Sequence, residues 1–421
     1  MNEIAGIAYT TARFDKEGRC IEQPALPDNA REVIVVSHGW NNDAGEAEQL
    51  YRALFTNFAA LHPGGTGGFA IVGVIWPSKK FDFTPEEAQQ QGQGLAAAAA
   101  AGGSAQLEQA SIARSLAEFE QVFKDEGKEE ELAQLRALAP DIGKPDAQTR
   151  FVETLKKIVG NPGTSDLDGS SFFFEQDDSR AVFTNATQAS SDVGDQAFDG
   201  GMSGAGIGDL FRGIGDAVGS LLNITTYYEM KKRAGTVGAQ GLAPLINAFG
   251  ARASVRHIHL IGHSFGARLV TAAAMASGTP KLYSMSLLQG AFSHNGFSDA
   301  GYFRKVVHDK RLAGPIIITH TANDKAVGKA YAIASRISRD SAQGVGDEND
   351  KYGGLGRNGA VNMRADQVSA TTKRMLDAEV PYALAKQVIH NLESSPFISD
   401  HGAVTGREVA WAISQAISSG G

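Results

Sequence analysis

Short β-branched apolar runs alternate along this chain with segments whose apolar residues recur at helical spacing. Residues 32–37 (EVIVVS) and 69–76 (FAIVGVIW) are two such runs, and each ends at a turn-forming sequence. Between them, residues 44–61 place apolar side chains three and four positions apart, with acidic residues in the first turn. Strands that alternate with helices form parallel sheets covered on both faces, so this pattern predicts an α/β fold.

The second half of the chain repeats the same alternation. Residues 255–262, 282–288 and 315–321 are predicted strands, and residues 265–277 are predicted to form a helix rich in small side chains. Residues 406–418 are predicted to form a closing amphipathic helix. We therefore expect a doubly wound, mostly parallel sheet.

A long insertion interrupts this order. Connections in α/β domains commonly run about 2 to 6 residues, yet residues 81–221 precede a helix expected to begin near Thr225. Helices are predicted within residues 106–138 and loops over residues 161–206. We assign residues 1–80 and 222–421 to an α/β core, and residues 81–221 to a mainly helical and loop insertion that is a candidate lid or cap.

The end of the insertion, residues 207–222, is amphipathic and has glycine at nearly every turn, which weakens a helix. Two interpretations follow. The segment is either a mobile cover over a pocket, which can also face a lipid surface, or a fixed helix packed on the domain. Its apolar residues are Ile207, Leu210, Phe211, Ile214, Val218, Leu221 and Leu222.

The strongest local pattern is Gly262-His263-Ser264-Phe265-Gly266, between a predicted strand and a predicted helix. A sharp strand-to-helix turn exposes a serine hydroxyl as a nucleophile, and flanking glycines allow that turn. The five letters alone are weak evidence in a chain with 49 glycines, and an ordinary glycine turn is the alternative. Because the required context is present, we predict Ser264 as a catalytic nucleophile.

A serine nucleophile needs a base and an acid that orients it. Asp324 follows an isoleucine-rich predicted strand, at the sheet edge where ligands bind in open α/β folds, although a turn or capping role is the alternative. His401 lies on a loop before the last helix and is the predicted base. Two other residues are alternatives to His401. They are His390, which is expected at the end of a helix, and Asp400, which could instead be a helix-capping residue.

The negative charge that develops on the substrate needs backbone N–H donors. Phe265, directly after the nucleophile, is expected to supply one. The turn that follows the strand at residues 32–37 is expected to supply the other, from the N–H of Trp40. The alternative is a tight turn in which Gly39 only relieves strain and Trp40 packs on the core.

The chain resembles the α/β-hydrolase superfamily in three features. These are the strand-to-helix turn around Ser264, or elbow (GHSFGARL), the HGW turn, and the chain order Ser264, Asp324, His401. The resemblance covers roughly residues 30–80 and 222–421. The finer pattern VSHGWNND, VIWPS and YYEMKKRA resembles a bacterial subgroup with largely unassigned substrates. The resemblance implies an esterase with a catalytic triad. Lipases and phospholipases of the superfamily often carry such insertions as lids, which implies a lipid or other ester substrate and contact with membrane surfaces.

A second interpretation belongs to another class. A hydrolase fold can also serve as a binding or scaffold protein, with the insertion as its interaction surface. Such a protein would not need Ser264, Asp324 and His401 to meet.

Composition excludes several other classes. The net charge of −8, without a run of lysine or arginine, argues against a nucleic-acid partner. The single cysteine, Cys20, excludes an internal disulfide or a cysteine zinc cluster. The longest apolar run, residues 95–101, is too short for a membrane helix. The first twenty residues lack a signal peptide's apolar core, which predicts a cytoplasmic protein unless a dedicated secretion system exports it.

Neither a cofactor nor a metal is expected. His257 and His259 point to one face of a predicted strand, but no third ligand stands at metal spacing near them, and ordinary packing is the preferred interpretation. The acidic loop near residue 350 has Lys351 where a calcium loop needs an oxygen ligand.

Overall fold

The computed structural model describes residues 2–78, 104–124, 126–160, 177–192, 214–324 and 353–419. Its centre is a sheet of nine strands within these ranges, in the order β1-β2-β5-β4-β6-β7-β8-β9, with β3 beside β2. From β2 to β9 every neighbouring pair is parallel, and only β1 and β3 run antiparallel to β2. The strands are β1 (Asn2–Ile4), β2 (Ile7–Phe14), β3 (Cys20–Glu22), β4 (Glu32–Ser37), β5 (Phe69–Ile75), β6 (His257–His263), β7 (Leu282–Leu288), β8 (Ile316–His320) and β9 (Ile389–Glu393).

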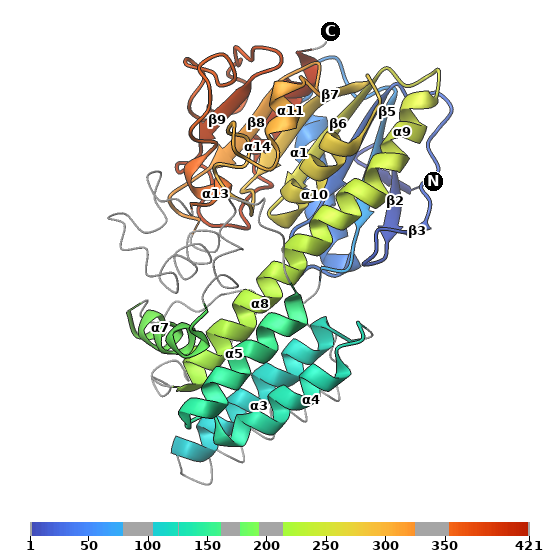
Figure 1. Cartoon of the computed structure of the whole chain (residues 1–421). Coiled ribbons are helices and arrows are strands. Elements are labelled where there is room, and N and C mark those ends of the chain that lie inside the picture. The colour runs from blue at the N-terminus through green and yellow to red at the C-terminus, as the bar shows by residue number, and fades with distance from the viewer. Residues whose placement is uncertain are drawn as a thin grey trace.

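Helices cover both faces of the sheet (Figure 1). On β4, Ile34 and Val36 face a cluster formed with α1 (Ala44–Leu61) and α14 (Arg407–Ser418), whereas Val33 and Val35 face the larger cluster on the other side. That larger cluster contains α10 (Phe265–Ala276), η2 (Val237–Leu242) and α9 (Ala243–Ala251). The predicted α/β fold with a mostly parallel sheet is therefore confirmed. Two short helices, α11 (Arg304–His308) and α13 (Leu355–Asn358), lie in the connections.

The insertion forms a helical bundle beside the sheet (Figure 1). Its helices are α3 (Ser104–Val122), α4 (Glu129–Leu138), η1 (Ala139–Asp141), α5 (Pro145–Val159), α7 (Ser179–Asp192) and the first half of α8 (Ile214–Thr236). Figure 1 shows α8 running from this bundle to the sheet, where it continues into η2 and α9. The predicted border between residues 221 and 222 therefore lies inside a continuous helix.

A buried arginine on α8 ties the insertion to the core. The Nη2 of Arg233 donates to the backbone oxygen of Val122, at 3.2 Å, and to Oε1 of Glu126, at 2.7 Å. Its Nη1 donates to the backbone oxygen of Pro77 at 3.0 Å, just after β5. Charged hydrogen bonds of this kind are strong when buried, so they fix the end of α3, which belongs to the insertion, against the core.

The described part of the candidate lid is packed. In α8, Val218 and Leu221 are fully buried and Leu222 is 3% exposed, in the same cluster as side chains of α3, α5 and α7. Burying such a side chain contributes about 1.5–3 kcal/mol. These residues favour the interpretation of a fixed helix. Residues 207–213 and the acidic loop around Lys351 lie outside the described residues.

Two secondary-structure predictions are wrong. The expected loops over residues 161–206 include the helix α7, whose Val182 and Phe183 are buried by neighbouring helices. His390 does not end a helix but lies in β9, which pairs in parallel with β8. None of the helices built from described residues has the length and apolar character needed to cross a membrane.

Candidate active site

The carboxyl edge of the sheet brings together the three side chains predicted for catalysis. Ser264 directly follows β6, Asp324 follows β8 after three residues, and His401 lies between β9 and α14. Because β6, β8 and β9 run in the same direction, their carboxyl ends share one edge. Residues separated by up to 137 positions in sequence therefore meet at one place.

The three side chains form a chain of hydrogen bonds. The Nε2 of His401 lies 2.8 Å from Oγ of Ser264, and its Nδ1 lies 2.9 Å from Oδ2 of Asp324. A carboxylate only accepts hydrogen bonds, so Nδ1–H donates to Asp324 and Nε2 is left to accept the serine proton. Asp324 is fully buried, whereas the His401 side chain is 23% exposed at the mouth of the site. This arrangement can deprotonate the serine.

The rival side chains take no part in this chain. His390 Nε2 lies 3.0 Å from the backbone oxygen of Ala385. Asp400 accepts hydrogen bonds from the hydroxyl of Ser399 and from the backbone N–H of Gly402, which is the loop-capping role considered for it.

The backbone of Ser264 is strained. Its φ of 57° and ψ of −122° are rarely adopted by a residue with a side chain. A Cβ atom at Gly262 would collide with the backbone of Gly266 and Ala267, and a Cβ atom at Gly266 would collide with the backbone oxygen of Ser37. The two glycines are therefore required by the close approach of β6, α10 and β4, and they hold the serine at the tip of the turn.

A glutamine that the sequence interpretation missed supports the acid. Gln289 Nε2 donates to Oδ2 of Asp324, at 3.3 Å, and to the backbone oxygen of Gly356, at 2.9 Å. Its Oε1 accepts from the hydroxyl of Thr319 at 2.7 Å. Gln289 directly follows β7, so the rule that selected Asp324, a polar residue at a strand's carboxyl end, would also have found it.

The turn at Gly39 lies against Ser264. A Cβ atom at Gly39 would stand only 2.7 Å from Cβ of Ser264, so only glycine fits there. The ring of Trp40 packs on that of Phe265 with 6.1 Å between centroids. Trp40 is also half-buried against the core, so the structure places it both beside the elbow and in the packing role that was the alternative.

His38 fixes the orientation of this turn, a role that was not predicted from the sequence. Burial lowers the pKa of His38 to about 4, so its ring is neutral at pH 7. The backbone N–H of Trp76 approaches its Nε2 at 3.4 Å, and its Nδ1 lies 2.9 Å from the backbone oxygen of Gly39. A protonated Nδ1 therefore donates to that oxygen. In a planar trans peptide the N–H points opposite to the C=O, so His38 sets the direction of the Trp40 N–H.

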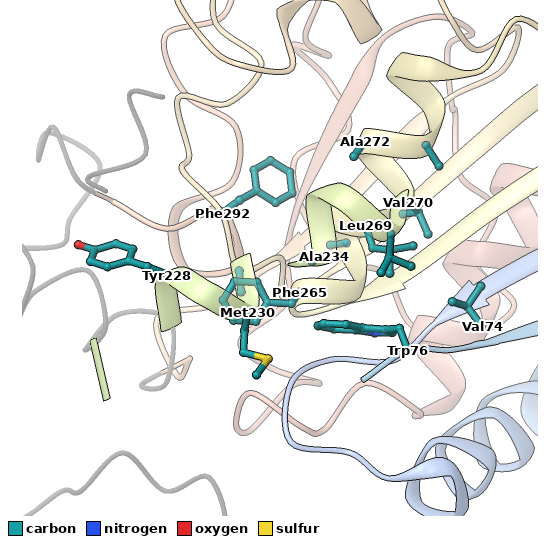
Figure 2. Close-up of a cluster of buried hydrophobic side chains, with 14 of the residues drawn as sticks. Val74, Trp76, Tyr228, Met230, Ala234, Phe265, Leu269, Val270, Ala272 and Phe292 are labelled. Carbon is teal, nitrogen blue, oxygen red and sulfur yellow. The ribbon is translucent and has the colours of Figure 1, made fainter. Parts of the chain in front are cut away.

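The motifs that carry the family resemblance contact one another. The N–H of Asn41 donates to the backbone oxygen of Ser78 at 2.9 Å, which joins the HGWNN turn to the WPS turn. The ring of Tyr227 on α8 lies 4.9 Å from that of Phe265. Figure 2 shows other side chains of α8, including Met230, packed beside Phe265 and near Trp76. The three segments therefore form one aromatic and apolar wall beside the elbow.

Comparison with known proteins finds no match to this chain among protein-family models, curated proteins or solved structures. A functional assignment therefore depends on the geometry of the site itself.

Proposed function

We propose that this protein is a serine hydrolase of the α/β-hydrolase fold that cleaves carboxylic esters, with Ser264 as nucleophile, His401 as base and Asp324 as the orienting acid. The observation that carries the proposal is the chain of two hydrogen bonds, 2.8 and 2.9 Å long, that links these side chains at one edge of the sheet. The strained backbone of Ser264 adds support, because such strain clusters at functional sites.

In the acylation step, Oγ of Ser264 attacks the carbonyl carbon of the ester while His401 Nε2 takes the hydroxyl proton. The backbone N–H groups of Phe265 and Trp40 are the proposed donors to the resulting oxyanion. As the carbon–oxygen bond to the alcohol breaks, the proton on Nε2 passes to the leaving alkoxide. Asp324 holds the imidazole in the required tautomer and stabilises its protonated form.

In the deacylation step, His401 takes a proton from water, and the hydroxide attacks the acyl-enzyme. The carboxylic acid leaves, and the proton returns to Oγ of Ser264. The balance of the cycle is one ester and one water consumed, with one acid and one alcohol released.

The surroundings of Ser264 favour apolar acyl groups. The rings of Trp40, Tyr227 and Phe265 form a wall beside the nucleophile, and apolar walls bind apolar parts of ligands. Lipid esters are therefore a candidate substrate class, as the resemblance implies. The alternative of a binding or scaffold protein gives no reason for the three polar side chains to be aligned, so the alignment favours the enzyme.

The test is labelling with a fluorophosphonate probe, followed by mass spectrometry of the modified peptide. The probe is expected to modify Ser264, and Ser264→Ala should lose both labelling and hydrolysis of a soluble short-chain ester while its circular dichroism stays unchanged. Ser298→Ala is the control, because Ser298 is similarly buried but only donates to a backbone oxygen. Turnover retained by folded Ser264→Ala protein would end the proposal.

A further inference from the structure

The amino edge of the sheet, opposite the proposed active site, holds a second cluster of titratable side chains. Glu32 is the first residue of β4, and His257 and His259 lie at the start of β6. The parallel register places Glu32 beside His257 and Ile34 beside His259. Side chains two residues apart on a strand point to the same face, so all three gather on one side of the sheet.

The donor atoms of these side chains converge. Oε2 of Glu32 lies 3.1 Å from Nδ1 of His257 and 3.0 Å from Nε2 of His259, and the three ligand atoms are within 4.8 Å of one another. A tetrahedral zinc ion with bonds of about 2.0–2.1 Å holds its ligand atoms about 3.3 Å apart. The two oxygen–nitrogen separations are already close to that value.

The protonation of the cluster suits a metal. The carboxylate accepts from both rings, and each of these two hydrogen bonds contains a proton that a cation can replace. Nδ1 of His259 is 2.8 Å from the hydroxyl of Ser284, and such an outer hydrogen bond fixes the ring of a ligating histidine.

The cluster is also accessible. The side chain of His259 is only 1% exposed, but those of His257 and Glu32 are 34% and 21% exposed. The ring of Tyr283 covers both imidazoles, with centroid separations of 4.8 and 5.7 Å. A cation can therefore enter past His257, and water can occupy the coordination positions that the protein leaves open.

We propose that Glu32, His257 and His259 form a binding site for a divalent transition metal of the zinc type. Two imidazoles and one carboxylate suit zinc, whereas calcium and magnesium prefer oxygen ligands alone. The ion would bridge β4 and β6, which are 225 residues apart in sequence, and so stabilise the native sheet. The site is independent of the proposed hydrolase chemistry, because His257 begins β6 and Ser264 follows its end, which places them roughly 20 Å apart along the strand.

The test is calorimetric titration of the metal-free full-length protein with Zn²⁺, together with thermal unfolding. One zinc ion per chain is expected, with a rise in Tm. His257→Ala and Glu32→Gln should weaken binding by at least about tenfold and abolish most of the rise in Tm. His257 is partly exposed, so the fold should tolerate its replacement. His308→Ala is the matched control, because His308 forms an exposed pair with Asp309 at 3.0 Å and should not affect binding.

The proposal fails if the wild-type protein binds no zinc, or if both variants bind it as tightly as the wild type. Zinc could instead bind a different histidine–carboxylate pair, at His401 and Asp324. Binding lost in His401→Ala but retained in His257→Ala would assign the ion to that pair and overturn the proposal.

Discussion

The imidazole of His263 donates a hydrogen bond of 2.9 Å to the backbone oxygen of His401. The residue directly before the proposed nucleophile thus holds the backbone of the proposed base. Burial, together with repulsion from His401, lowers the pKa of His263 to about 3, so the ring stays neutral and Nε2 keeps the proton it donates. The elbow therefore positions two members of the site, Ser264 by its own backbone and His401 through this side chain.

We expect His263→Ala to lower kcat on a soluble ester by roughly 10 to 100-fold with little change in KM, because a small displacement of a base is costly. His263→Asn, whose amide can still donate, should restore part of the loss. His390→Ala is the control, since His390 is also buried but lies outside the site. Equal kcat in all three variants would contradict the positioning role.

The base and the acid should differ in their contributions. His401→Ala removes the proton acceptor and should lower kcat by about 10⁶, whereas Asp324→Asn should cost about 10⁴, as in triads that act as a unit. The measurement is single-substrate kinetics on protein shown to be folded. If His390→Ala silenced the enzyme and His401→Ala did not, the assignment of the base would be wrong.

Ser264 and Asp324 could be placed at one edge of the sheet because each follows a predicted strand whose direction is fixed by the α/β pattern, whereas His401 was selected as a loop residue before the predicted closing helix. Seven elements were predicted with the correct bounds or within one residue at each end, namely β4, α1, β5, α10, β7, β8 and α14. Glu32 could not be selected in this way. Its place beside His257 and His259 depends on β4 being the neighbour of β6, and strand order is not visible in local periodicity.

The errors have local physical causes. Helix α7 contains serine, threonine and asparagine, which favour caps and turns, and it is stabilised by burial against other helices, a tertiary effect that composition does not show. His390 was expected at the end of a helix, but the strand β9 forms there because β8 offers an edge for parallel pairing.

Folding should be less favourable in acid because of the buried histidines. The folded pKa values of His38 and His263 are about 4 and about 3, below the unfolded value of about 6.5. At a pH between the folded and unfolded pKa values, the unfolded chain binds more protons than the folded one. The stability that these two histidines contribute is therefore fully present above pH 6.5 and is lost as the pH falls towards 3. Burial lowers the pKa of further histidines in the same direction, namely His62, His259, His320 and His390.

Urea unfolding at pH 7 and pH 5 measures this effect. His38 and His263 should each contribute up to about 1.4 kcal/mol per pH unit, and His38→Asn should remove one such contribution from the slope. His308→Ala, at an exposed position, should leave the slope unchanged. A slope in His38→Asn equal to that of the wild type would show that His38 does not titrate with folding.

The final prediction concerns the insertion and decides between a packed helix and a lid. Leu221 is fully buried in α8 among the helices of the bundle, so Leu221→Ala should reduce the free energy of unfolding by about 2–5 kcal/mol. If the helix is packed, the variant protein that remains folded should lose the same fraction of its activity, or none, on a soluble short-chain ester and on an aggregated long-chain ester. Lys232→Ala, on the exposed face of the same helix, is the control and should change neither stability nor activity appreciably. A selective loss on the aggregated ester, with stability unchanged, would instead favour a helix that opens to a lipid surface. The same measurements on Leu222→Ser extend the test to the next buried position. A substitution in a lid should lower the activity on the aggregated ester, whereas a substitution in the core should lower the free energy of unfolding.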